Sequence, residues 1–265
     1  MRILKSIWLR GLLLVAAVTV PLFLATQGKP QASAASAHKA VVVELFTSEG
    51  CSDCPPADDL LARLRRQPPA DGVEIIPLGL HVDYWNSQGW KDRFSSSEYS
   101  ERQQRYAGKL HVDGPYTPQM VVDGVSQFVG NDPQAAAKAI RDAAQRPQSA
   151  IIQIAGDDKK FEVAVKAPQQ TSGEVMLAIT EDNLMSKVTA GENNKRELHH
   201  AAVVRDLRSL GRLHDGSFEA AFPLKLNKDW KRDDLRIVVF VQEPHTGPID
   251  GAASLQLAGK SAAAN

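Results

Sequence analysis

Cysteine is scarce in this sequence: its 265 residues include only two, Cys51 and Cys54. A bond between them would close so short a loop that it would add little beyond local stiffness, which argues against a purely structural disulfide. Aromatic residues are also few, at 6%. The 31 basic residues are balanced by 31 acidic ones, so neither nucleic acid nor an anionic membrane surface is an expected partner. No second long apolar run follows the N-terminal segment, so no further transmembrane span is expected.

The N-terminal segment has the composition of a secretory signal. Residues 1–10 carry three basic side chains, residues 11–25 are apolar except for Thr19, and small residues follow up to Ala35-Ser36-Ala37. A basic stretch, an apolar stretch and an Ala-x-Ala site are typical of a signal peptide. We therefore predict a signal peptide over residues 1–37 and a periplasmic or secreted protein, with an uncleaved N-terminal anchor as the alternative.

The two cysteines lie where a predicted strand meets a predicted helix. Residues 41–47 are apolar and rich in β-branched side chains, which indicates a buried strand, and residues 57–66 have the pattern of a helix. Cys51 and Cys54 stand between them. A helix N-terminus favours the thiolate, because its unpaired N–H groups and its dipole stabilise negative charge. Since the thiolate is the reactive form in disulfide exchange, a redox or metal-binding role is favoured over a static bond.

The following residues alternate between strand and helix patterns. Residues 73–82 form a near-continuous apolar run, as expected for a strand covered on both faces. A polar helix capped by Ser95–Ser97 is predicted to run to about Lys109. A hairpin with an Asp123-Gly124 turn is then expected over residues 119–129, followed by an Ala-rich helix ending at Arg146. The predicted order is thus β-α-β-α-β-β-α.

This order, together with the dithiol position, resembles the thioredoxin fold. Thr117-Pro118 strengthens the resemblance, because thioredoxin-like proteins carry a cis proline just before the third strand, beside the dithiol. The resemblance implies that Pro118 shapes the groove that receives a partner and that Thr117 contributes to substrate binding. Thioredoxins often bury an acid six residues before the first cysteine. Here Leu45 holds that place and Glu44 precedes it, so strand alternation would turn Glu44 to the other face. This orientation argues against a role for Glu44 as a proton relay unless a β-bulge intervenes.

A closer resemblance rests on several motifs. These are Glu44-Leu45-Phe46-Thr47-Ser48, Cys51-Ser52-Asp53-Cys54-Pro55-Pro56-Ala57-Asp58, His81-Val82-Asp83-Tyr84-Trp85 with Gly89-Trp90, and Tyr116-Thr117-Pro118-Gln119. Together they resemble the secreted bacterial family catalogued as domain of unknown function 1223. That family is placed among thioredoxin-like proteins, so the resemblance implies fold and redox class but no substrate.

The chain changes character after residue 148. Short strands, several alternating apolar and polar, are punctuated by glycine, proline, asparagine and aspartate, with no further helical pattern. We therefore predict an α/β thioredoxin-like fold followed by an all-β sandwich-like C-terminal domain. The expected boundaries are 38–148 for the first domain, 149–258 for the second and 259–265 for a frayed tail. Residues 198–207 are predicted to form one strand, which places His199 and His200 on opposite faces, unable to bind one ion together.

Several further residues are candidates for the site. His81 and Asp83, at the end of a predicted strand, can support the dithiol, although ordinary strand-end hydrogen bonds explain them equally well. Trp85 and Trp90 lie in the aromatic-rich loop that follows. They serve either as packing beneath the loop or as a docking surface for a protein substrate.

Three functions fit these features. The first is an exported thiol–disulfide oxidoreductase in which Cys51 attacks and Cys54 resolves the mixed disulfide. Its partners are then protein thiols or disulfides in the cell envelope, and it needs neither a cofactor nor a metal. The second is a copper chaperone that adds His81 or His111 to the thiolates, although such proteins usually have three residues between the cysteines. The third is a non-catalytic envelope binding protein that recognises its ligand through the β domain. The redox direction is not determined by the sequence.

Overall fold

A computed structural model describes residues 31–32, 39–157 and 159–257. The predicted signal peptide therefore lies outside the described residues except for β1(Gln31–Ala32), which pairs with β6. The predicted tail, 259–265, lies wholly outside them. Among the described residues no helix combines the length and apolar character needed to cross a membrane.

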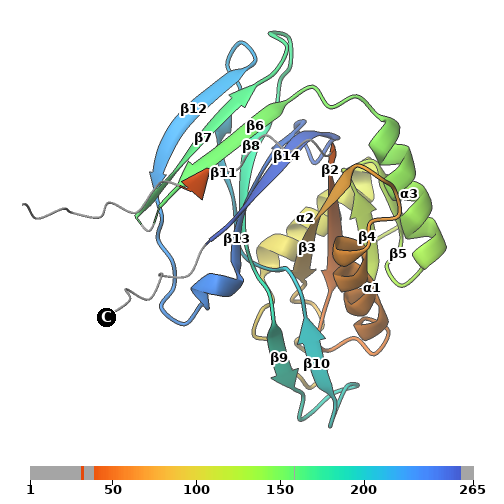
Figure 1. Ribbon diagram of the computed structural model, residues 1–265. Coiled ribbons are helices and arrows are strands. Elements are labelled where there is room, and N and C mark those ends of the chain that lie inside the picture. Colours follow the sequence, from red (N-terminus) through yellow and green to blue (C-terminus); the bar gives the residue numbers. More distant parts are fainter. Residues whose placement is uncertain (1–30, 33–38, 158, 258–265) are drawn as a thin grey trace, which may run out of the picture.

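The N-terminal half follows the order expected from the sequence (Figure 1). Its elements are β2(Lys39–Thr47), α1(Pro55–Arg66), β3(Val73–His81), α2(Ser97–Lys109), β4(Gln119–Val122), β5(Ser126–Val129) and α3(Pro133–Gln145). Side chains fix the starts of α2 and α3, because Ser96 and Asp132 accept hydrogen bonds from free N–H groups in the first turns of these helices. Asp123 and Gly124 both have positive φ, 47° and 67°, as a type I′ hairpin turn requires.

The C-terminal half is all β apart from one short 3₁₀ turn. Its strands are β6(Ile151–Gly156), β7(Lys160–Lys166), β8(Glu174–Glu181), β9(Leu184–Lys187), β10(Glu197–His200), β11(Val203–Arg212), β12(Ser217–Pro223), β13(Leu235–Gln242) and β14(Ile249–Gln256). The prediction of one strand over residues 198–207 was wrong. The chain turns between β10 and β11, with Ala202 in the left-handed conformation (φ 53°), and β10 pairs with β9, which the sequence pattern did not indicate.

The two halves share one mixed sheet of eight strands, in the order β14-β13-β8-β11-β3-β2-β4-β5. The expected all-β part is therefore not self-contained. The junction is narrow: β11 runs parallel to β3 and pairs with it at Val203 and Gly79. A Cβ on Gly79 would lie 3.3 Å from the carbonyl oxygens of Ala201 and Ala202, so glycine permits this close approach. The predicted boundary at residue 148 falls between α3 and β6, and the division into two domains stays a prediction.

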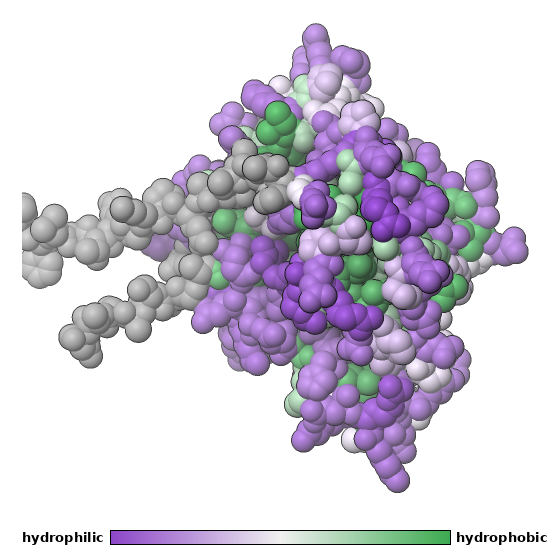
Figure 2. Space-filling model, turned by 45° about the vertical axis from the view of Figure 1, so that its right-hand side comes forward, coloured by the Kyte–Doolittle hydropathy of each residue, from purple (hydrophilic) through white to green (hydrophobic). Residues whose placement is uncertain are grey.

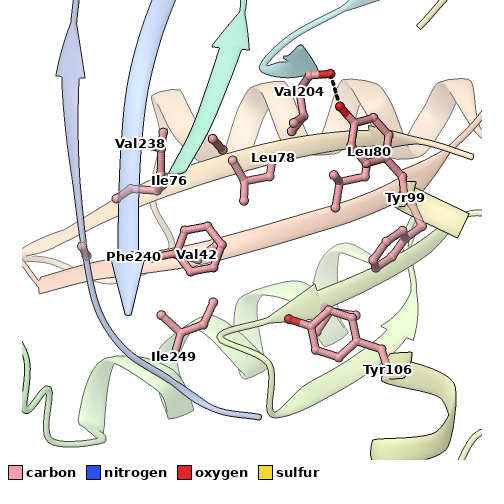
Figure 3. Close-up of a cluster of buried hydrophobic side chains, with 14 of the residues drawn as sticks. Val42, Ile76, Leu78, Leu80, Tyr99, Tyr106, Val204, Val238, Phe240 and Ile249 are labelled. Carbon is pink, nitrogen blue, oxygen red and sulfur yellow. Dashed lines mark hydrogen bonds between the residues drawn. The ribbon is translucent and has the colours of Figure 1, made fainter. Parts of the chain in front are cut away.

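Three apolar cores hold the sheet to its covering layers. One core follows a single face from β2 and β3 to β13, beneath α2, and includes Val42, Tyr106 and Phe240 (Figure 3). Because strand residues alternate, the opposite face carries the other two. Val41, Val43 and Leu45 pack there against α1 and α3. Farther along, β8 and β13 pack against the smaller antiparallel sheet β1-β6-β7-β12, which gives this half its sandwich-like packing.

The surface has no single large apolar area in the view of Figure 2, which shows mostly hydrophilic side chains with small apolar patches between them. The exposed large apolar residues of the described chain are dispersed: Tyr84, Val125, Val129, Ile151 and Met185. The architecture is a mixed α/β fold with a main mixed sheet and smaller antiparallel sheets, and the two cysteines follow the carboxyl end of β2, an interior strand of the main sheet between β3 and β4.

Candidate redox site

Cys51 and Cys54 form a disulfide at the start of α1, with their Cα atoms 5.4 Å apart. The chain leaves β2 at Thr47, turns through residues 48–50 and enters the helix at Cys54, which is its N-cap. Two prolines then occupy the first helical positions, where a missing N–H costs nothing. The N–H groups of Ala57 and Asp58 both bond to the carbonyl of Cys54. The dithiol therefore sits at the positive end of a helix dipole, as predicted.

The disulfide is almost wholly covered. Cys51, which the sequence nominated as the attacking residue, is only 2% exposed and Cys54 is fully buried, while Ser52 and Asp53 between them are exposed. The loop between β9 and β10 covers the turn. Asn193 donates hydrogen bonds of 2.9 Å to the carbonyls of Glu49 and Cys51, and Glu192 accepts one from the Ser52 N–H. A loop distant in sequence thus packs over the turn that carries Cys51.

A cis peptide bond joins Thr117 and Pro118, as the thioredoxin resemblance implied. Pro118 precedes β4, and its Cβ lies 3.1 Å from the point that a Cβ on Gly130 would occupy, with Ala57 of α1 at 3.4 Å from the same point. This contact set places the proline beside the first turn of the helix that carries Cys54. Trp85 links the same segment to the cysteine turn. Its indole N–H donates to Thr117 Oγ1 at 2.7 Å, and its Cβ lies 3.1 Å from a Cβ position on Gly50.

Trp90 is partly buried on the other side of the turn. Its indole N–H donates to Glu49 Oε2 at 2.7 Å, and its Cβ lies against Gly191 of the β9–β10 loop. Both tryptophans thus border the dithiol turn and use their polar atoms to hold neighbouring loops. Asp83 points elsewhere, accepting a hydrogen bond from Ser100 on α2. His111, the other possible chaperone ligand, is exposed after the end of α2.

Glu44 belongs to a different buried group, here called the Glu44 network, on the face of β2 that α2 covers. Arg102 Nε donates to its Oε1 at 2.7 Å and the Tyr106 hydroxyl donates to its Oε2 at 2.5 Å. Gln242 of β13 completes the network by bonding to both Arg102 and Tyr106. Leu45 occupies the α1 face instead. The acid that the sequence offered as a proton relay is therefore committed to an ion pair on the opposite face.

A second polar group, the His81–His200 cluster, lies beneath the dithiol and consists of Asp58, His81 and His200 with Glu49 and Asp92. Donor atoms of Asp58, His81 and His200 all lie within 4.8 Å of one another, and all three residues are buried. His81 Nδ1 is 2.6 Å from Asp92 Oδ2, which also accepts the Glu49 N–H. His200 Nε2 is 3.3 Å from Glu49 Oε1, but neither atom has an aligned hydrogen-bond partner among the described residues.

The carboxyls of this cluster have shifted pKa values. Burial raises the pKa of Asp58 to about 7, although nearby His200 and a hydrogen bond from Thr47 Oγ1 favour its ionised form. Burial also opposes ionisation of Asp92 and Glu49. Their pKa values nevertheless lie below normal, because His81 stabilises the Asp92 carboxylate and because nearby His200 and the hydrogen bond from Trp90 stabilise the Glu49 carboxylate. The Trp90 N–H is well aligned with Glu49 Oε2, whereas the His200 ring is not aligned with Glu49 Oε1.

Of the three residues whose donor atoms lie close together, Asp58, His81 and His200, only His81 was a candidate site residue from the sequence. His200 was placed correctly on the face opposite His199, which is exposed, but it was dismissed as a ligand because only its neighbour was considered. Asp58 had a usable signal: it lies three residues before Leu61 on the apolar stripe of α1, where a carboxyl is unusual.

A comparison with known protein families assigns the chain to one of them. The model of a family described as protein of unknown function (DUF1223) matches residues 42–242. The chain belongs to this family. No curated protein matches the sequence of this DUF1223 protein.

Two solved structures resemble this DUF1223 protein. A crystal structure of a protein from Agrobacterium tumefaciens is 26% identical, covers 86% of this chain and 99% of its own, and superimposes with a TM-score of 0.69. HBP35 of Porphyromonas gingivalis is 16% identical, with 88% of this chain and 80% of its own covered, at a TM-score of 0.59. The latter supports the fold alone.

Proposed function

We propose that this DUF1223 protein is an exported thiol–disulfide oxidoreductase that exchanges its Cys51–Cys54 disulfide with protein thiols in the cell envelope. The observation that carries the proposal is the disulfide at the N-terminus of α1, with the cis Thr117–Pro118 bond beside the same helix turn. A structural disulfide this local would contribute little to folding, whereas the helix dipole lowers the free energy of a thiolate there.

We further propose that the N-terminal half is thioredoxin-like and that the C-terminal strands are an addition to it. Three features support this: the order β-α-β-α-β-β-α, the sheet order β3-β2-β4-β5, and helices on both faces. The added strands extend this sheet beyond β3, and one of their hairpins, β9–β10, reaches back to the dithiol. On this reading the addition supplies a cover for the reactive sulfurs.

In the proposed exchange, a partner thiolate attacks Cys51 Sγ and the Cys51–Cys54 bond breaks. The electron pair of that bond leaves on Cys54 Sγ, which becomes a thiolate at the helix N-terminus. A second partner thiolate then attacks its own sulfur in the mixed disulfide. The partner leaves oxidised, and Cys51 is released as a thiolate. The reverse sequence reduces a partner disulfide. Either direction requires the β9–β10 loop to move, because Cys51 is only 2% exposed in the closed form.

In this proposal, residues that border the Cys51–Cys54 turn recognise the protein partner. Trp85 and Trp90 are partly buried, so each presents part of an indole ring at the site while its N–H is bonded to Thr117 or Glu49. Aromatic rings held in place supply contact area at low entropic cost. We expect Trp85→Ala and Trp90→Ala to reduce exchange with a protein substrate more than exchange with a small disulfide.

The decisive experiment measures turnover and redox potential together. Protein expressed from the full-length gene is equilibrated with glutathione buffers to obtain the potential of the Cys51–Cys54 couple, and is then assayed for insulin reduction and refolding of scrambled ribonuclease. We expect Cys51→Ser to abolish turnover and Cys54→Ser to accumulate a mixed disulfide. A potential near −270 mV would indicate a reductant and one near −120 mV an oxidant, by comparison with known couples. Absence of exchange with every protein and small disulfide tested would overturn the proposal in favour of the binding-protein alternative.

A further inference from the structure

The His81–His200 cluster combines a carboxylate and two imidazoles from three separate elements. Asp58 comes from α1, His81 from the end of β3 and His200 from the end of β10, and donor atoms of the three lie within 4.8 Å of one another. A metal ion bound at about 2.0–2.2 Å from each donor needs separations of about 3.3–3.6 Å. The donor atoms therefore have to approach one another by at most about 1.5 Å to share one ion.

His81 is held as a metal-binding histidine usually is. Its Nδ1 lies 2.6 Å from Asp92 Oδ2, and Asp92 is itself fixed by the N–H groups of Glu49 and Phe94. A carboxylate on one ring nitrogen orients the imidazole and leaves the other nitrogen, Nε2, free to bind an ion. The contact between His81 and Asp92 forms without a metal ion, but it holds the imidazole in the orientation that a metal site requires.

His200 provides an observation independent of the acids. Its side chain is 2% exposed, yet neither ring nitrogen has a hydrogen-bond partner among the described residues, and the same holds for Glu49 Oε1. A buried polar group without a partner is destabilising, so such a group needs an explanation. Binding an ion through one nitrogen while the other turns to Glu49 would satisfy all three atoms.

The charge of the cluster also favours a cation. Three carboxyls, those of Glu49, Asp58 and Asp92, surround two imidazoles, and no lysine or arginine bonds to them in the part of the chain that the structure describes. Buried charge of one sign has to be neutralised by a proton or a metal ion.

We propose that Asp58, His81 and His200 bind a divalent transition metal, with Zn²⁺ as the best match. Two imidazoles and one carboxylate are nitrogen and oxygen donors that suit Zn²⁺, and three protein ligands leave a fourth position for another group. This proposal does not depend on dithiol exchange, because it concerns side chains below the disulfide and applies to the oxidised protein.

Phe94 lies between the cluster and the surface. Its ring lies 5.4 Å from that of His81 and 5.6 Å from that of His200, and it also lines a surface cavity of about 380 Å³ beside the β8–β9 turn. The preference for a cation comes from the cluster itself, because the charged residues of this cavity are of both signs: Glu181 and Asp229 with Arg93, Arg205 and Lys231.

The test measures Zn²⁺ binding to protein from the full-length gene with its disulfide intact, so that the thiols cannot contribute. Competition with a chromophoric chelator should give one Zn²⁺ per chain. His200→Ala and Asp58→Asn should each weaken binding by at least 100-fold, and Asp92→Asn by about 10- to 100-fold. The chain offers matched controls in adjacent exposed residues: His199→Ala and Asp59→Asn should change the affinity by less than about threefold.

Co²⁺ provides a readout that does not rely on folded variants. The oxidised wild-type protein should give the visible d–d bands of a low-coordinate nitrogen and oxygen site, without a thiolate charge-transfer band. Failure of the oxidised protein to bind Zn²⁺ or Co²⁺ would overturn the proposal, as would equal weakening by the control variants. Binding seen only after reduction, with a thiolate band, would assign the metal to the cysteines instead and would likewise overturn it.

Discussion

The two buried polar groups of this protein differ in how completely their atoms are paired. In the Glu44 network, both carboxylate oxygens, the Arg102 side chain, the Tyr106 hydroxyl and the Gln242 amide bond to one another in the middle of a packed core. In the His81–His200 cluster, Asp92 is well bonded, but His200 and one oxygen of Glu49 are not. Fully paired buried groups hold a fold together, whereas an incompletely paired group needs an explanation, for which we propose a bound metal ion.

The largest expected effect comes from breaking the paired network. Arg102→Met should leave the Glu44 carboxylate buried without its cation and lower the free energy of unfolding by about 3–5 kcal/mol. Arg105→Met is the control, because Arg105 lies on the same helix with its side chain 52% exposed, and it should cost less than about 0.5 kcal/mol. Urea denaturation of the oxidised protein measures both.

Adding Glu44→Met to Arg102→Met should restore part of the lost stability, because an apolar pair can replace a buried ion pair. Equal losses from Arg102→Met and Arg105→Met would mean that the Glu44 network contributes little to the fold.

A buried carboxyl near the Glu44 network gives the comparison a pH test. Asp123 accepts the Val42 N–H, and burial raises its pKa to about 7 despite that bond and the nearby charges of Arg146 and Lys39. Between pH 4 and 7 the folded state then holds a proton that the unfolded state releases, so stability falls as the pH rises through this window. The loss can reach about 4 kcal/mol, at about 1.4 kcal/mol per pKa unit.

Asp123→Asn keeps an oxygen for Val42 but cannot ionise, so the stability difference between wild type and variant should shrink or reverse between pH 4 and pH 8. Asp132→Asn serves as the control, since Asp132 is exposed at the start of α3. Denaturation curves at several pH values measure the difference. A constant difference across the range would show that Asp123 titrates normally.

Local patterns explain why the N-terminal half could be predicted. Ser96 and Asp132 cap helices within a few residues of themselves, and Asp123-Gly124 sets a turn on its own, so each signal is complete in one short stretch. The separate β9 strand and the docking of β11 on β3 depend on contacts between distant residues such as Gly79 and Val203. No short stretch carries that information, and the shared sheet was accordingly not foreseen.

The candidate site likewise has one part that short motifs predict and another that depends on contacts between distant residues. The spacing of Cys51 and Cys54 and the Thr117-Pro118 pair are local motifs, and both the disulfide and the cis bond are present. Asp58 and His200 have meaning only when α1, β3 and β10 come together. For Glu44, alternation along β2 correctly indicated the sheet face away from α1. The partners that define its role, Arg102 and Gln242, come from α2 and β13, so the pattern of β2 alone did not reveal them.

A smaller effect is expected where the β9–β10 loop meets the dithiol. Asn193→Ala removes two hydrogen bonds to the cysteine turn, and each contributes about 0.5–1.5 kcal/mol. The loop should open more often, so dithiothreitol should reduce the disulfide roughly tenfold faster. Asn194→Ala, at the exposed next residue, should leave the rate unchanged. An unaltered rate in Asn193→Ala would mean that the loop does not limit access to Cys51.

The smallest effect is expected for His200→Phe, and this variant best distinguishes the His81–His200 cluster from the Glu44 network. His200→Phe places an apolar ring of similar shape where Phe94 and His81 already pack around the imidazole. If His200 is an unpaired group awaiting an ion, this change should alter the free energy of unfolding by less than about 1 kcal/mol in the presence of a chelator, because no hydrogen bond is lost. Excess Zn²⁺ should then stabilise the wild type, by about 2.7 kcal/mol at a hundredfold excess over Kd, and leave the variant unchanged. Should His200→Phe instead cost as much as Arg102→Met, the 3.3 Å contact between His200 and Glu49 is a structural ion pair. The two buried groups would then serve the same purpose.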